Sequence, residues 1–282
     1  MKHVTLIAGM VLCGAGAPAM AELVYGVTLT QTLVSWDSAA PGTILSGAPV
    51  QGLAPNETVQ GLDLRPATGE LFALGSFSNL YRVNPANGQA TFVAPLSASL
   101  NGSSFGFDFN PTVDRIRTVS DADQNLRSVP STGVTTVDGT LAFAAGDVNA
   151  GVNPNVVGAA YTNNFMTGAG TQLFVVDAGL DALLLQNPAN SGQLTTIGSL
   201  GTDITDLSTF DISGNTGVAY MSIRDMNLSR STFWTVNLST GAGMMVGEVG
   251  GGSIITAMTV VPAPASAALL GLGMAAALRR RR

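Results

Sequence analysis

The chain is poor in charge and nearly lacks three residue types that enzymes often use. Its 282 residues include one Cys, one His and one Lys, namely Cys13, His3 and Lys2. Charged residues make up 11% of the chain, against about 25% in an ordinary globular domain. Beyond residue 21 the sequence therefore excludes Ser-His-Asp and Cys-His catalysis, Schiff-base lysines and zinc sites built from His and Cys. A hydrophobic share of 46% also argues against a disordered chain.

The N-terminal segment is typical of a secretory signal peptide. A short basic start precedes the mostly apolar residues 4–17, and Ala19-Met20-Ala21 fits the small-x-small rule for signal peptidase. We expect cleavage after Ala21, so that residues 1–21 are removed on export. Cys13 lacks the small preceding residues that lipoprotein acylation sites prefer.

The C-terminal tail, residues 262–282, combines a proline motif, an apolar run and a basic end. The proline motif is Pro262, Ala263 and Pro264, and the apolar run spans residues 265–278. The basic end consists of Arg279, Arg280, Arg281 and Arg282. The apolar run is shorter than the ~20 residues of a comfortable span, but counting from Val260 brings it close to that length. The positive-inside rule places the four Arg in the cytoplasm. We therefore expect a single transmembrane helix here, with the folded part outside.

This order of three parts resembles the PEP-CTERM sorting signal, although the usual Pro-Glu-Pro is Pro262-Ala263-Pro264 in this sequence. The resemblance covers only the tail. It implies recognition by an exosortase-type membrane protease, cleavage near the proline motif, and delivery to the cell surface or extracellular matrix after a transient inner-membrane anchor. A plain single-span anchor is the alternative.

The charge balance excludes one class of partner. Between the signal and the terminal Arg cluster, seven Arg stand against all 18 acidic residues, a net charge of −11. Such a surface repels phosphate backbones, so we do not expect nucleic acid as a partner.

Residues 22–261 consist of short apolar runs separated by turn signals, without a long helical period. A unit of four predicted strands recurs, first at residues 62–66, 71–74, 80–83 and 90–93. Aligning the first strands of the units gives intervals of 45, 52, 51 and 48 residues, with aligned positions at Asp63, Asp108, Ala160, Asp211 and Thr259. Propeller repeats have about 40–50 residues.

The two ends of this region complement each other. Three predicted strands at residues 23–27, 33–36 and 43–45 lack a first strand, and residues 254–260 form a first strand with nothing after it. Together they complete one unit and close a ring, which removes open sheet edges. The sequence therefore predicts an all-β fold, a five-bladed β-propeller over residues 22–261. A large β-sandwich is the alternative.

Residues 106–111, Gly-Phe-Asp-Phe-Asn-Pro, are followed by Asp-Arg-Ile-Arg at residues 114–117. This pattern resembles the signature of a bacterial secreted family of unknown function, over most of residues 23–260. The resemblance supports the propeller fold and implies no activity.

Asp63, Asp108 and Asp211 occupy the same place in three units and are the main candidate site residues. As channel carboxylates, two of them would serve as acid and base in glycoside hydrolysis. Alternatively, each accepts hydrogen bonds from the hairpin that follows it. Repetition favours this structural interpretation, because an active site is normally built once.

Other candidates are weaker. Asp121, Asp123 and Asn125 open like a calcium loop, but Leu126 stands where the loop needs Gly, so a solvated turn is favoured. Residues 147–155 are either a binding loop or a connector. Arg115 and Arg117 alternate on one strand, and we expect a buried ion pair with Asp114 or the repeated Asp residues.

Two functions follow from these observations. The first is an exported, non-catalytic binding or structural propeller of the envelope or matrix, with an extracellular polysaccharide as a possible ligand class. The second is a secreted glycan-active hydrolase that uses the channel carboxylates, an analogy resting on fold alone. We favour the first and expect no cofactor.

Overall fold

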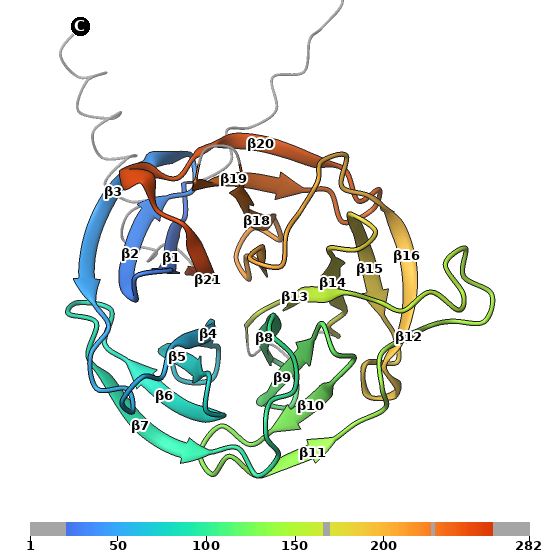
Figure 1. The fold of residues 1–282 in the computed structure, drawn as a ribbon, viewed down its shortest axis with the longest axis horizontal. Coiled ribbons are helices and arrows are strands. Elements are labelled where there is room, and N and C mark those ends of the chain that lie inside the picture. The colour runs from blue at the N-terminus through green and yellow to red at the C-terminus, as the bar shows by residue number, and fades with distance from the viewer. Residues whose placement is uncertain (1–20, 166–169, 227–228, 262–282) are drawn as a thin grey trace, which may run out of the picture.

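The computed structural model describes residues 21–165, 170–226 and 229–261. Within them, the strands form five antiparallel sheets set around a central axis, which confirms the all-β, five-bladed propeller (Figure 1). The predicted signal peptide, apart from Ala21, and the whole predicted sorting tail with its transmembrane helix lie outside the described residues. In the described ranges, no helix has both the length and the apolar character needed to cross a membrane.

The strands of each blade are given in order from the innermost to the outermost. Blade 1 contains β4 (Val59–Arg65), β5 (Glu70–Gly75), β6 (Asn79–Val83) and β7 (Ala90–Pro95). Blade 2 contains β8 (Phe105–Asn110), β9 (Arg115–Ser120), β10 (Asn125–Ser128) and β11 (Thr135–Val137). Blade 3 contains β13 (Val156–Tyr161), β14 (Leu173–Asp177), β15 (Ala182–Gln186), β16 (Gln193–Ser199) and, outermost, β12 (Ala142–Phe143). Blade 4 contains β17 (Thr209–Ile212), β18 (Ala219–Asp225), β19 (Arg230–Val236) and β20 (Gly243–Glu248).

Blade 5 joins the two ends of the propeller chain, as the sequence predicts. Its order is β21 (Ile255–Val261), β1 (Leu23–Thr28), β2 (Thr32–Asp37) and β3 (Ala40–Pro49). β21 and β1 pair antiparallel, with Leu23 opposite Val261 and Val27 opposite Ala257. The ring is therefore closed by hydrogen bonds between strands that lie more than 200 residues apart.

The core lies between the blades, because each sheet packs on a neighbour at both faces. One apolar cluster joins Phe72 and Leu74 of blade 1 to Phe107, Phe109 and Ile116 of blade 2. Most residues of the inner strands are buried, including the Asp residues of β4 and β8 that interrupt the apolar positions in the sequence.

Close contact between inner strands depends on glycine. Gly61 and Gly106 lie two residues before Asp63 and Asp108. A Cβ at Gly61 would lie 2.4 Å from Cβ of Phe107, and one at Gly106 would lie 2.5 Å from the backbone N of Ala159. The missing side chains let successive inner strands approach closely around the axis.

Candidate functional site

Three carboxylates lie at one level near the axis and form what we term the carboxylate ring: Asp63, Asp108 and Asp211. They stand on the inner strands β4, β8 and β17, and their exposed fractions are 1%, 1% and 3%. The equivalent positions of blades 3 and 5 hold Ala160 and Thr259, which are both fully buried.

Two members of the ring use both oxygens to accept backbone N–H groups. Asp63 accepts from Leu64 at 2.7 Å through Oδ1 and from Phe109 at 2.8 Å through Oδ2. Asp211 accepts in the same way from Ile212 and Val260, each at 2.6 Å.

Asp108 completes the set by accepting the N–H of Tyr161 at 3.0 Å through Oδ2. The five donors are equivalent, since each follows the aligned position of its own blade. The innermost strand pairs along one edge only, and N–H groups on its other edge need acceptors. The three carboxylates supply them for all five blades.

This arrangement corrects the expected hydrogen bonds. The structural interpretation assigned each Asp to the hairpin that follows in its own blade. Instead, one oxygen of each Asp accepts from the inner strand of the next blade, and the own-blade bonds of Asp63 and Asp211 come from the next residue of the same strand. The reason is direction: at this register the side chain points out of its sheet toward the neighbouring blade. Thr259 closes the circle between blades 5 and 1, because its hydroxyl donates to Oδ1 of Asp63 at 3.0 Å.

Burial and mutual repulsion set the protonation of the ring. Burial raises the pKa of Asp63 well above its ordinary value, and the charge of Asp211 adds to this effect. Burial likewise raises the pKa of Asp108, followed by the charges of Asp63 and Asp211. Burial raises the pKa of Asp211 to about 7, against the opposing effect of its two backbone hydrogen bonds. The folded ring therefore holds protons at a pH where exposed carboxyls have lost them.

One oxygen of the ring has no donor. Oδ1 of Asp108 is buried without a hydrogen-bond partner among the described residues. Asp108 therefore has fewer hydrogen bonds that stabilise its charged form than Asp63 and Asp211 have.

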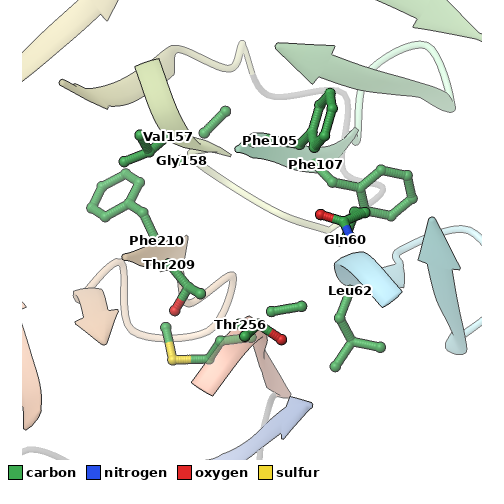
Figure 2. A pocket seen from close by; sticks show the side chains of 14 residues that line it. Gln60, Leu62, Phe105, Phe107, Val157, Gly158, Thr209, Phe210 and Thr256 are labelled. Carbon is green, nitrogen blue, oxygen red and sulfur yellow. The ribbon is translucent and has the colours of Figure 1, made fainter. Parts of the chain in front are cut away.

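A funnel opens on the axis at the end where the inner strands begin. Equivalent residues, three positions before the aligned ring positions, surround it: Gln60, Phe105, Val157, Ser208 and Thr256. Its outer part holds about 220 Å³ of space that water-sized groups can occupy, and its inner part about 20 Å³, which is room for a single water. The inner part is lined by residues of all five inner strands (Figure 2). We call this space the axial funnel.

The funnel is polar but almost without charge. Its lining contains amides and hydroxyls, among them Gln31, Gln60 and Thr58, and its single charged side chain is that of Asp206. The sequence analysis missed this site. Its signal was present as a second repeated position, three residues before the aligned Asp, but the residue types there differ from blade to blade.

The expected buried ion pair of Arg117 is present with a different partner. Arg117 is 2% exposed, and its Nη1 lies 2.9 Å from Oδ2 of Asp138. Asp114 instead accepts two hydrogen bonds from Arg65, and Arg115 donates to the backbone carbonyls of Val113 and Asp114. The prediction of Asp114 or a repeated Asp as the partner is therefore wrong, because β10 and the segment after β11 bring Asp138 to this position.

The three candidate calcium ligands make different contacts. Oδ1 of Asp121 accepts the N–H of Ser103, while Oδ1 of Asn125 accepts from Nη1 of Arg117 at 2.6 Å. Asp123 has a left-handed backbone, with φ 60°, and its buried Oδ1 has no partner among the described residues. In the part of the chain that the structure describes, no group of three or more His, Cys, Asp or Glu is placed to hold a metal ion.

The loop at residues 147–155 projects from the rim between β12 and β13 (Figure 1). Asp147 anchors its base, because it accepts both the N–H and the hydroxyl of Thr196 in β16. Val148, between two residues that contact Thr196, is 86% exposed. The loop thus has a fixed start beside blade 3, and at its end Nδ2 of Asn155 donates to Oδ1 of Asp206 in the funnel lining at 3.1 Å.

Comparison with known proteins supplies a family but no activity. The model of the family described as "Domain of unknown function (DUF4394)" matches residues 32–259. No curated protein matches the chain.

Solved structures with similar folds are remote in sequence. A protein from Lactobacillus plantarum is 17% identical, with a TM-score of 0.41 over 85% of this chain and 71% of that one. A protein of unknown function from Bacteroides thetaiotaomicron is 12% identical, with a TM-score of 0.47 over 81% and 58%. A candidate 6-phosphogluconolactonase from Bacteroides uniformis is 14% identical, with a TM-score of 0.43 over 81% and 82%.

Proposed function

Because the chain belongs to the DUF4394 family of domains of unknown function, we propose its function from its geometry: a non-catalytic binding propeller of the cell envelope or extracellular matrix. One observation carries the non-catalytic part. Five of the six oxygens in the carboxylate ring accept backbone N–H groups of the inner strands. These carboxylates therefore hold the blades together around the axis.

The hydrolase alternative needs a different arrangement. Glycoside hydrolysis uses two carboxyl groups about 5–9.5 Å apart that face a substrate cleft, one of them reaching a water or a glycosidic oxygen. Asp63, Asp108 and Asp211 are each at most 3% exposed. A glycosidic bond cannot approach side chains that are buried between inner strands, so the geometry favours binding over catalysis.

The location is part of the proposal and rests on the sequence. Residues 1–21 have the pattern of a secretory signal, and residues 262–282 resemble an exosortase-type sorting signal. Signal peptidase and an exosortase-like protease are then the processing partners. The protein passes through a transient inner-membrane anchor before it reaches the cell surface or the surrounding matrix.

The test is a combined binding and turnover screen of the purified full-length protein against extracellular polysaccharides and glycan arrays. We expect binding without release of reducing ends. The variant Asp108→Asn sharpens the test, because it preserves the acceptor for Tyr161 and removes an ionisable carboxyl. Hydrolysis that this variant abolishes at an unchanged melting temperature would establish the enzyme instead.

A further inference from the structure

The axial funnel is a built site rather than a gap between blades. Its narrow part is lined by all five inner strands, and the buried carboxylate ring lies further along the same strands, so the walls belong to the most firmly held part of the fold. The outer part holds about 220 Å³ of space that water-sized groups can occupy. Small-molecule sites have about 300–1,000 Å³, so the funnel has room for one small unit rather than an oligomer.

Two amide side chains in the funnel are held in fixed orientations. Oε1 of Gln31 accepts the N–H of Val59 at 2.8 Å, and Nε2 of Gln60 donates to Oγ1 of Thr58 at 2.9 Å. Each bond uses one end of the amide. It leaves Nε2 of Gln31 as a donor and Oε1 of Gln60 as an acceptor for a ligand, and Figure 2 shows Gln60 at the edge of the opening.

An unsatisfied hydroxyl lies deeper in the funnel. Thr209 lines its inner part and is 7% exposed, yet its Oγ1 has no hydrogen-bond partner among the described residues. Buried polar atoms are normally paired, and an exception calls for an explanation such as a ligand or an ordered water. This oxygen has almost no exposed surface, and the inner part has room for about one water. A ligand in the outer funnel therefore does not touch Thr209 directly.

The remaining wall is apolar, and the electrostatics disfavour anions. The half-buried ring of Phe105 and the 53% exposed side chain of Leu29 lie at the funnel. Asp206, the single charged side chain of its lining, is negative. A ligand with hydroxyl groups on one edge, an apolar face and no negative charge fits this combination.

We infer that the axial funnel binds a neutral saccharide, a terminal or internal sugar unit of a polysaccharide without uronate, phosphate or sulfate groups. This inference rests on the proposed binding function and assigns it a ligand class and a place. Gln31 and Gln60 hydrogen-bond the sugar hydroxyls, and Phe105 packs on the apolar face of the ring.

The experiment measures binding of neutral and uronate-containing oligosaccharides to the full-length protein by calorimetry, with three variants. Gln31→Glu keeps the acceptor for Val59 and removes the NH₂ donor, so we expect a similar melting temperature and roughly tenfold weaker binding of the neutral saccharide. Gln60→Ala should weaken binding similarly. The matched control is Gln193→Ala in β16, an exposed Gln outside the funnel, and should leave affinity unchanged.

The outcomes separate the two proposals. Neutral-saccharide binding that survives both Gln31→Glu and Gln60→Ala would overturn the funnel as the site while leaving a binding propeller. Tighter binding of uronate-containing oligosaccharides, or binding of neither class at millimolar concentration, would overturn the ligand class. Turnover of the bound saccharide would instead overturn the proposed non-catalytic function.

Discussion

At the scale of single residues, the three axial carboxylates differ in the hydrogen bonds that a substitution would remove. Asp63 and Asp211 use both oxygens on N–H donors, and Asp63 also accepts the hydroxyl of Thr259. Asp108 has one donor, at Oδ2, and none of the described residues donates to its Oδ1. Substitution by Asn, which replaces one acceptor oxygen with an NH₂ group, should therefore have unequal effects at equivalent positions.

We predict that Asp63→Asn lowers the free energy of unfolding by about 1–3 kcal/mol, because its NH₂ group would face a buried N–H donor and leave it unpaired. Asp108→Asn should be close to neutral, since its oxygen can serve Tyr161 and its NH₂ can take the place of the unpartnered Oδ1. Asp108→Ala removes the acceptor for Tyr161 and should again cost about 1–3 kcal/mol. Denaturant midpoints measure all three effects. Equal loss in the two Asn variants would contradict this assignment.

The same residues predict the pH dependence of stability. Their pKa values are raised in the folded protein, to about 7 for Asp211, so the folded state binds more protons than the unfolded state above a pH of about 4. The stabilisation is complete below the unfolded pKa and is lost as pH rises through the folded pKa. The free energy of unfolding should therefore fall between pH 5 and pH 8, more gently in Asp108→Asn. Urea titrations at constant ionic strength test this, and stability that rises over that window would refute it.

At the scale of elements, most strand positions could be predicted from the turn residues between them. Turn signals between apolar runs located four strands in each blade, and the unmatched strands at both ends located the closure by β21 and β1. β12 was missed because two residues, Ala142 and Phe143, show no periodicity, and their parallel pairing with β16 depends on the third dimension. Phe109 as a partner of Asp63 and Asp138 as the partner of Arg117 were missed for the same reason. Both partners lie outside the strand of the residue they contact, and local sequence carries no information about which element a face will meet.

Inner-strand packing predicts an element-scale effect of glycine. Gly61→Ala should lower the melting temperature, because the new Cβ would lie 2.4 Å from Cβ of Phe107 and overpacking typically costs about 1–3 kcal/mol. The matched control is Gly146→Ala, where a Cβ would meet nothing within 4 Å. Thermal melts of the two variants should therefore differ by several degrees. A similar melting temperature for the two variants would mean that blades 1 and 2 can move apart without a loss of stability.

At the scale of the whole molecule, closure makes the two ends of the propeller interdependent. Val260 in β21 gives its N–H to Asp211 of blade 4, and Thr259 gives its hydroxyl to Asp63 of blade 1. β21 therefore completes blade 5 and links the carboxylate ring on both sides. The sorting tail that we propose begins directly after this strand, so processing near Pro262–Pro264 leaves the ring intact, whereas a cut a few residues earlier would open it.

Two truncations test this boundary together with the proposed sorting. Removing residues 265–282 deletes the apolar run and the Arg cluster but retains β21, so we expect a folded propeller that is released from the producing cell rather than held in its membrane. Removing residues 255–282 also deletes β21, exposes the edge of β1 and leaves Asp211 without Val260. This second form should lose its cooperative melt or aggregate. Cell fractionation and thermal melts compare the two, and membrane retention of the first form would show that the tail is not what anchors the protein.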